Sequence, residues 1–135
     1  LSKSTCLSAD VSAAYDPTYA SAYEAKNSCY INEGVVISKY TGHGGKYDTS
    51  DASAEYMGKV RSLLEKNNVM WQVGELGKVD MGGGGTIAKY VANMNVDVVD
   101  LGVPVLCMHA PFEIVSKIDV YMAYRAFFAF FDDKI

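Results

Sequence analysis

Short runs of β-branched and apolar residues alternate along this chain with segments of helical spacing, and this alternation constrains the fold more than any other feature. Strands separated by helices are typical of layered α/β domains with a largely parallel sheet. The sequence therefore predicts an α/β domain, with strands over residues 5–10, 34–40, 69–73, 96–101 and 103–108 and helices over residues 51–67, 86–93 and 116–131.

Several of these elements carry signals at their ends. Ser50 or Asp51 is placed to cap the first long helix, and Ser116 to cap the last, because a side-chain oxygen before a helix accepts from a backbone N–H of the first turn. Residues 11–30 are rich in Ala, Ser and Tyr and contain an Asp-Pro turn signal, so they predict a loop or a broken helix. Residues 41–50 contain three glycines and predict an exposed loop in which His43 lies at the surface.

Two segments in the last third of the chain carry residue types with chemical potential. Gly82–Gly85 precede Thr86 and open a short helix, where backbone N–H groups can hold a phosphate. His109 follows an apolar strand, which is a common way to present a metal ligand. The structural alternatives are tight backbone packing for the glycines and a hydrogen-bonded structural role for the histidine. No Lys-Ser/Thr pair follows the glycines, so a P-loop is not indicated.

Composition excludes some classes of protein. The chain has 135 residues, half of them apolar, which suits one domain with a sizeable core. A formal net charge of −4 argues against nucleic acid as a partner. No apolar run reaches the roughly 18 residues that a membrane span requires, so we expect no membrane partner. The three cysteines have no CxxC spacing and favour a reducing, cytoplasmic location. Because the chain begins at Leu1 with no signal-peptide pattern, we expect a segment of a longer protein.

The predicted last helix is apolar on almost every side. A helix of this kind must be covered by protein on more than one face. We expect the cover to come from a part of the protein outside this segment or from a neighbouring subunit. The apolar positions are Ile118, Val120, Tyr121, Met122, Tyr124, Phe127, Phe128, Phe130 and Phe131.

Seven motifs occur in an order that resembles one enzyme family. The order and spacing are similar to the C-terminal part of the catalytic domain of aspartyl and vacuolar aminopeptidases, which are co-catalytic zinc exopeptidases. The resemblance covers nearly the whole chain. The motifs are Ser8-Ala9-Asp10, Pro17 with Tyr19, Gly34-Val35-Val36-Ile37, the Gly-Thr-Ile turn at Thr86, Asp100-Leu101-Gly102-Val103-Pro104, Met108-His109, and Glu113.

The resemblance implies a fold, an activity and partners. The whole of residues 1–135 would form one segment of a three-layer α/β/α sandwich with a mostly parallel sheet, without the first half of the domain and without an inserted lid domain. The parent protein would be a cytoplasmic homo-oligomer that removes the amino-terminal residue of peptides by means of a water activated by two divalent metal ions, most simply zinc. Asp10 resembles the later Asp ligand and His109 the final His ligand, one on each metal of the pair.

The resemblance also implies substrate contacts. Gly84, Gly85 and Thr86 would border the substrate cleft and offer backbone N–H groups to substrate oxygens. Lys39 lies one residue from the position of a basic residue beside the cleft. Glu113 would orient His109 from outside the ligand set, although a purely solvated role stays open.

The rest of the family's machinery is not in these residues. The chain has no Glu-Glu pair and only two histidines, so the general base, the bridging Asp and the first His would lie upstream of Leu1, and we expect the isolated chain to be inactive. Aspartyl members also have His residues after the ligand Asp, and residues 11–17 have none. An acidic and a neutral or broad amino-terminal preference therefore both stay open.

Two other function classes remain open at this stage. One is an anion- or nucleotide-binding module that uses the Gly82–Gly85 turn. The other is a non-catalytic assembly element, which the apolar last helix and the missing ligands favour for the isolated segment.

Overall fold

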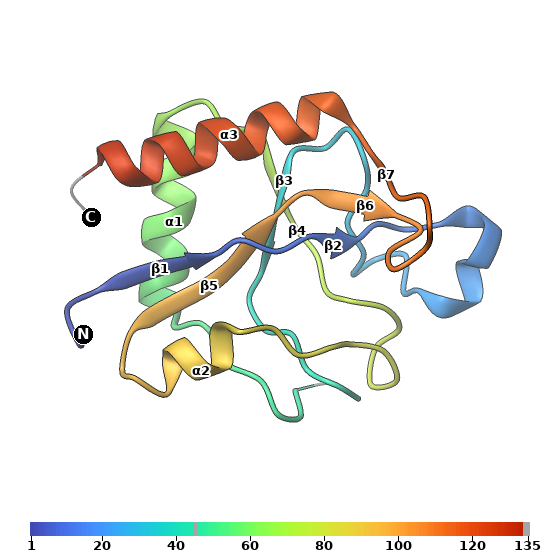
Figure 1. The fold of residues 1–135 in the computed structure, drawn as a ribbon, viewed down its shortest axis with the longest axis horizontal. Helices are drawn as coiled ribbons and strands as arrows, with labels where there is room; N and C mark the ends of the chain where they lie inside the picture. Colours follow the sequence, from blue (N-terminus) through green and yellow to red (C-terminus); the bar gives the residue numbers. More distant parts are fainter. Residues whose placement is uncertain (45, 134–135) are drawn as a thin grey trace.

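A computed structural model describes residues 1–44 and 46–133 of the chain (Figure 1). Helices and strands alternate as the sequence predicts, which confirms the α/β class. In chain order the elements are β1 (Thr5–Ser8), β2 (Ser12–Ala13), the 3₁₀ helix η1 (Pro17–Ala22), β3 (Val35–Ser38), α1 (Ala54–Lys66), β4 (Trp71–Val73), α2 (Ala88–Ala92), β5 (Asp97–Gly102), β6 (Pro104–Leu106), β7 (Ile114–Val115) and α3 (Lys117–Asp132).

The strands form two sheets of mixed direction. The larger sheet has the order β1-β5-β3-β4, and the smaller has the order β2-β6-β7. The pairs β1–β5, β3–β4 and β2–β6 are parallel, whereas β3–β5 and β6–β7 are antiparallel. Parallel pairing thus predominates only slightly, because β5 enters the middle of the larger sheet in the opposite direction to β3.

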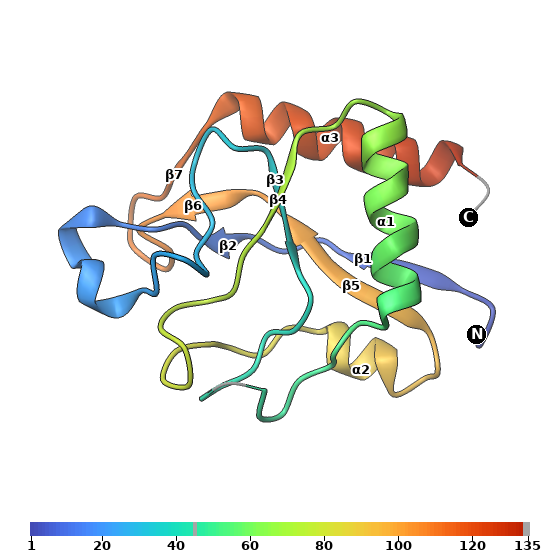
Figure 2. The ribbon, with the colours of Figure 1, turned by 180° about the vertical axis from the view of Figure 1, so that it is seen from behind.

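The two sheets are joined by one continuous pair of chain segments. Thr5 pairs with Asp97 in the larger sheet and Ala13 pairs with Val105 in the smaller one, with the same separation along the chain in both cases. Residues 5–13 and 97–105 are therefore paired in a single register, and Figures 1 and 2 both show these segments side by side. The register is interrupted only around Gly102, where an added Cβ would lie 1.2 Å from the Asp10 carbonyl oxygen.

The main core lies between the larger sheet and helices α1 and α3. Val99 and Leu101 of β5 belong to this core, whereas Asp100 between them faces the other side of the sheet, towards the segment that leads into α2. Figure 1 shows α3 and α2 on opposite sides of β1 and β5. This layering agrees with part of an α/β/α sandwich.

Helix α3 packs through its small residues. Its buried positions are Asp119, Ala123, Ala126 and Ala129, spaced three or four residues apart on one face. The aromatic side chains predicted to need cover lie mostly at the surface, and the most exposed of them are Tyr121, Tyr124, Phe128 and Phe131. The structure thus leaves the apolar outer face of α3 uncovered.

Helix α3 is attached to the sheet by a buried carboxylate. Asp119 is fully buried, and its two oxygens accept from the backbone N–H of Asn32 at 2.7 Å and of Gly34 at 2.8 Å. The Ser116 hydroxyl adds a bond of 2.6 Å to the Asn32 side chain. Gly34 has φ +88° and lies so close to Met70 that no side chain fits there. The turn before β3 is thereby fixed against the first turn of α3.

Several element boundaries differ from the sequence-based prediction. Ser53, and not Ser50 or Asp51, caps α1 by accepting from the Tyr56 N–H at 3.2 Å, because Asp51 is engaged by two lysines. Ser116 is confirmed as the cap of α3. Residues 11–30 contain η1, which is kinked at Tyr19, so the broken helix is confirmed but the short strand β2 was not predicted. Strand β7 was not predicted either.

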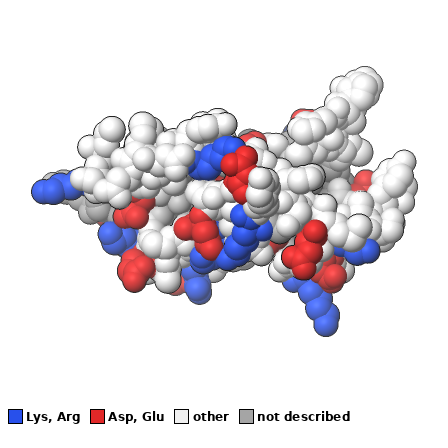
Figure 3. Space-filling view, turned by 90° about the horizontal axis from the view of Figure 1, so that it is seen from below, with Lys and Arg blue, Asp and Glu red and all other residues white. Residues whose placement is uncertain are grey.

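Two observations concern nucleic acid and membranes as partners: the distribution of surface charge and the character of the helices. On the face drawn in Figure 3, acidic and basic side chains lie beside one another and do not gather into a patch of one sign. None of the helices within residues 1–44 and 46–133 combines the length and the apolar character of a membrane span.

The Asp119 contacts lead to a stability prediction. We expect Asp119→Asn to lower the free energy of unfolding by about 2–3 kcal/mol, because a buried amide can accept from one of the two N–H groups but turns a donor towards the other. Urea unfolding of the protein with and without the substitution measures this. Asp132→Asn, an exposed aspartate at the end of the same helix, is the control and should change the free energy by less than about 0.5 kcal/mol. An equal loss in both variants would show that the buried contacts are unimportant.

Candidate metal and substrate site

Asp10 lies in the interruption of the paired segments, two residues after the end of β1. Its side chain is exposed, and Oδ1 accepts from the Val11 N–H at 2.8 Å. The close approach of its backbone to Gly102 fixes its place beside β5. A groove next to Asp10 is lined by Gly102, Val103 and Phe127 among others. Asp10 is therefore a carboxylate held on rigid backbone at the rim of a groove.

His109 lies in the loop between β6 and β7 and is also exposed. It has φ +68°, and Cys107 two residues earlier has φ +59°, so the loop turns sharply after the strand. Glu113 accepts from the backbone N–H of His109 at 2.6 Å. Glu113 thus stabilises the loop that carries the histidine by a hydrogen bond to its backbone and not to the imidazole.

The two predicted ligands lie at the ends of strands in different sheets. Asp10 is level with Gly102, whereas His109 lies beyond the end of β6. In the described part of the chain, no three His, Cys, Asp or Glu side chains come together as a metal site would require. A carboxylate and an imidazole are ligands that zinc takes, but a zinc site needs at least three protein ligands. The donor types fit the metal, and the pairing of Asp10 with His109 stays a prediction.

Thr86 connects three elements on the other side of β5. Its hydroxyl donates to Asp100 Oδ2 at 3.1 Å and lies 3.4 Å from the Thr41 hydroxyl, beyond the end of β3. The backbone N–H of Ala88, the first residue of α2, donates to the same Thr86 oxygen at 3.2 Å. The predicted substrate residue Thr86 is therefore part of a polar network.

Asp100 was not predicted as a site residue, and the structure places it at the centre of this network. It is 6% exposed, and its Oδ1 has no hydrogen-bond partner among the described residues. Burial raises the pKa of Asp100, the hydrogen bond from Thr86 opposes that rise, and the charge of Asp10 adds to it. The signal available in the sequence was a carboxylate inside the β-branched run Val98–Leu101, where an apolar residue would be expected.

The glycine turn packs against the loop after β3. The Gly44 N–H donates to the Gly82 oxygen at 2.9 Å. Gly83 has φ +110°, and a Cβ there would lie 1.5 Å from the Gly42 oxygen. Gly82 and Gly83 line a small pocket together with Thr41 and Glu75. The predicted residues Gly84 and Gly85 are not among the lining residues of that pocket.

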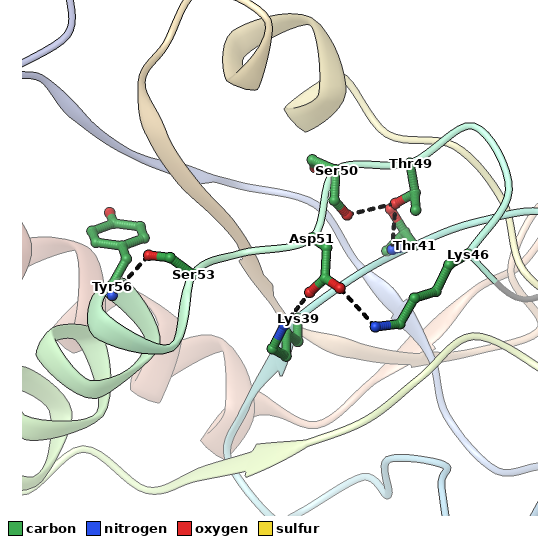
Figure 4. A network of polar contacts seen from close by, with 8 residues as sticks. All are labelled: Lys39, Thr41, Lys46, Thr49, Ser50, Asp51, Ser53 and Tyr56. Atoms are coloured by element: carbon green, nitrogen blue, oxygen red, sulfur yellow. Dashed lines mark hydrogen bonds and ion pairs between the residues drawn. The ribbon is translucent and has the colours of Figure 1, made fainter.

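Lys39 is already paired with a carboxylate. Figure 4 shows Lys39 and Lys46 converging on Asp51, and the Lys46 Nζ lies 2.6 Å from Asp51 Oδ2. Burial raises the pKa of Asp51, but hydrogen bonds from the two lysines outweigh burial and bring the pKa below its ordinary value. Lys46 also lies over the Tyr40 ring, 4.4 Å from its centre. A substrate contact by Lys39 would therefore compete with the Asp51 ion pair.

Glu75 is a second site residue that sequence reasoning missed. It lines the pocket beside Gly82, and burial raises the pKa of its carboxyl to about 7. The positive charge of Lys46 opposes this rise and the negative charge of Asp51 adds to it. Nothing local in the residues around Glu75 predicts burial, because the pocket is formed by segments distant in sequence.

The raised pKa of Glu75 leads to a prediction about stability and pH. Its folded pKa of about 7 lies above the ordinary value of 4.5, so between these pH values the unfolded chain releases a proton that the folded protein keeps. The free energy of unfolding therefore falls as pH rises through this range. We expect Glu75→Gln to stabilise the protein by about 1–2 kcal/mol at pH 8, after allowing for solvent screening, and to have little effect at pH 4.

Urea unfolding at the two pH values tests this prediction, with the exposed Glu65→Gln as the matched control. The same effect of Glu75→Gln at both pH values would contradict it.

Comparisons with known proteins agree with the family resemblance and with the fold. The family model described as Aminopeptidase I zinc metalloprotease (M18) matches residues 1–131. The chain is 49% identical over 130 residues to a probable M18 family aminopeptidase 1 of Borrelia garinii subsp. bavariensis, covering 96% of this chain and 28% of that protein. It is 32% identical over 132 residues to aspartyl aminopeptidase 1 of Schizosaccharomyces pombe, covering 97% of this chain and 27% of that protein.

Solved structures share the fold. The crystal structure of aminopeptidase I from Clostridium acetobutylicum has a TM-score of 0.94 and 49% identity, over 98% of this chain and 29% of that one. PhTET1-12s, described as a dodecamer, has a TM-score of 0.64 at 22% identity, over 90% of this chain and 31% of that one, which shows the fold alone. The chain spans less than a third of the length of these relatives. With nearly all of its residues matched, the chain belongs to the M18 family of aminopeptidase I zinc metalloproteases.

Proposed function

We propose that the protein containing this chain is a metal-dependent aminopeptidase that hydrolyses the amino-terminal residue of peptides. The match of the M18 family model to residues 1–131 is the observation that carries the proposal. The chain supplies part of the catalytic domain, since it covers about 28% of its relatives.

In this proposal the chain contributes Asp10 and His109 as ligands to a pair of zinc ions. Their exposed side chains leave both available to further ligands from the rest of the protein. Bound zinc supplies a Lewis acid that polarises the peptide carbonyl and lowers the pKa of a bound water. Glu113 fixes the loop that carries His109, and Gly102 allows the backbone of Asp10 to lie against β5. The general base is expected from outside these residues.

The substrate is proposed to lie along the glycine turn. Gly84, Gly85 and Thr86 offer backbone groups to it, and Lys39 reaches it when released from Asp51. The greater identity to the M18 aminopeptidase 1 than to the aspartyl aminopeptidase, 49% against 32%, supports a neutral or broad amino-terminal preference. The absence of histidine from residues 11–17 supports the same preference.

The assembly and location are also proposals. The exposed aromatic face of α3 supports burial in a larger protein or a homo-oligomer, and PhTET1-12s, which shares the fold, is described as a dodecamer. The free thiols of Cys6, Cys29 and Cys107 fit a reducing cytoplasm.

The anion-binding alternative is less well supported. Helix α2 has only five residues, and the N–H of Ala88 is already bonded to Thr86. Gly82 and Gly83 use their backbones to pack on the loop after β3. These groups are therefore engaged within the protein and are not free to surround a phosphate.

Substitution of the proposed ligands in the full-length enzyme tests the function. We expect Asp10→Asn and His109→Gln each to lower kcat/KM by at least about a hundredfold and to reduce the bound zinc, because each removes a ligand that the rest of the site cannot replace. Release of amino-terminal residues and zinc content are measured on the same samples. His43 is an exposed histidine outside the proposed site, so His43→Gln is the control and should keep both the activity and the zinc content. Full activity and zinc content in the two ligand variants would exclude these roles.

A further prediction concerns the chain on its own. We expect residues 1–135 to release no amino-terminal residue from peptides at a measurable rate, even with added zinc, because catalytic groups that act as a unit lose nearly all rate when some are missing. The assay compares the purified chain with the full-length enzyme at equal molar concentration. Zinc-dependent turnover by a chain that mass spectrometry shows to be free of longer species would refute the proposed division of the active site.

A further inference from the structure

The direction of the hydrogen bonds at Thr86 is set by Asp100. A carboxylate can only accept, so the single hydroxyl proton of Thr86 points to Asp100 Oδ2, 3.1 Å away. The Thr86 oxygen is then left to accept, and it does so from the Ala88 N–H at 3.2 Å. The Thr41 hydroxyl at 3.4 Å faces the same oxygen. Asp100 thus fixes both the rotamer and the polarity of Thr86.

This anchor matters because the turn before Thr86 has no side chains of its own. Four successive glycines have a large conformational entropy, so contacts with neighbouring segments are needed to restrict them. At one end, Gly82 and Gly83 pack against Gly42 and Gly44. At the other end, the contact of Thr86 with Asp100 attaches the turn to β5. Removing the contact between Thr86 and Asp100 leaves this end of the turn attached only through α2, which packs against β5.

Asp100 is built into a rigid part of the fold. It is paired with Ser8 across the β1–β5 ladder and with Ser38 across the β3–β5 ladder, so its backbone is held from both sides. Its neighbours Val99 and Leu101 lie in the core under α1 and α3. The carboxylate therefore holds the glycine turn in a fixed place relative to strand β5.

We propose that Asp100 is a positioning residue for catalysis, which holds Thr86 and the glycine turn in the form that receives the peptide substrate. The inference rests on the proposed aminopeptidase function. Asp100 acts through Thr86 and does not touch the substrate. Asp100 is 6% exposed, its Oδ2 accepts from Thr86, and its Oδ1 has no hydrogen-bond partner among the described residues.

The test uses the full-length enzyme and four variants: Asp100→Ala, Thr86→Val, the double variant and Thr86→Ser. Asp100→Ala and Thr86→Val are each expected to raise KM about tenfold and to change kcat less than about threefold, because the metal-bound chemistry is left in place. The KM of the double variant should lie within about twofold of the KM of either single variant, since both substitutions remove the same contact. Thr86→Ser keeps the hydroxyl that donates to Asp100 and should therefore raise KM less than Thr86→Val does.

A buried carboxylate with a merely structural role gives a different result when it is replaced. Asp119→Asn removes another buried carboxylate that holds backbone, and it should lower stability while leaving KM unchanged. Hydrogen exchange separates local from global effects. Faster exchange in Asp100→Ala should be confined to the amides of residues 82–88. If Asp100→Ala unfolds globally, the isosteric Thr86→Val carries the kinetic test.

Two outcomes would overturn the inference alone. One is an active enzyme in which Asp100→Ala and Thr86→Val leave KM unchanged, and the other is a double variant whose KM rises by the product of the two single effects. An unmodified full-length protein that releases no amino-terminal residue with any divalent metal would instead overturn the proposed function and this inference together.

Discussion

The arrangement of the candidate site depends on the single register that pairs residues 5–13 with residues 97–105. This pairing joins the two sheets and places Asp10 level with Gly102. A side chain at position 102 would overlap the Asp10 carbonyl, so the register can pass through this point only because the residue is glycine. The same register sets Ser8 beside Asp100 and directs β6 towards the loop that carries His109. The positions of Asp10, of the neighbouring Ser8 and Asp100, and of the loop that carries His109 therefore follow from one strand alignment.

Strand β5 shows how stability and the candidate site share the same residues. Val99 and Leu101 point into the core beneath α1 and α3, and Asp100 between them points to Thr86 and the glycine turn. The period of two along a strand makes this division unavoidable once the core face is chosen. A central strand that is rigid on one face can hold a catalytic or substrate-binding segment precisely placed on the other. The cost is a buried carboxylate with one oxygen that has no hydrogen-bond partner in the described part of the chain.

Local patterns in the sequence were sufficient to predict the main helices and strands. They were insufficient to predict the contacts between distant segments. The β-branched run before Ser38 and the helical spacing between Ala54 and Lys66 predict β3 and α1, because both signals lie within one element. Strands β2 and β7 have two residues each, which is too short for any period to show. The antiparallel entry of β5 beside β3, the pairing of Lys39 with Asp51, and the burial of Glu75 all arise from contacts between distant segments. The family resemblance supplied Asp10 and His109 as candidates, but it did not indicate that Asp100 anchors Thr86.

Helix α3 shows why an apolar sequence does not reveal which face is buried. Ala123, Ala126 and Ala129 form a face that lets the helix lie close to the sheet, and Asp119 in its first turn fixes the approach through two backbone N–H groups. Larger side chains on that face would push the helix away from the sheet. Tyr121, Tyr124 and Phe128 are consequently directed outwards, where their rings contact one another in sequence along the helix. A row of aromatic side chains that contact one another loses less conformational entropy on burial than flexible side chains would, so this face is well suited to form a permanent contact with the rest of the protein or with another subunit.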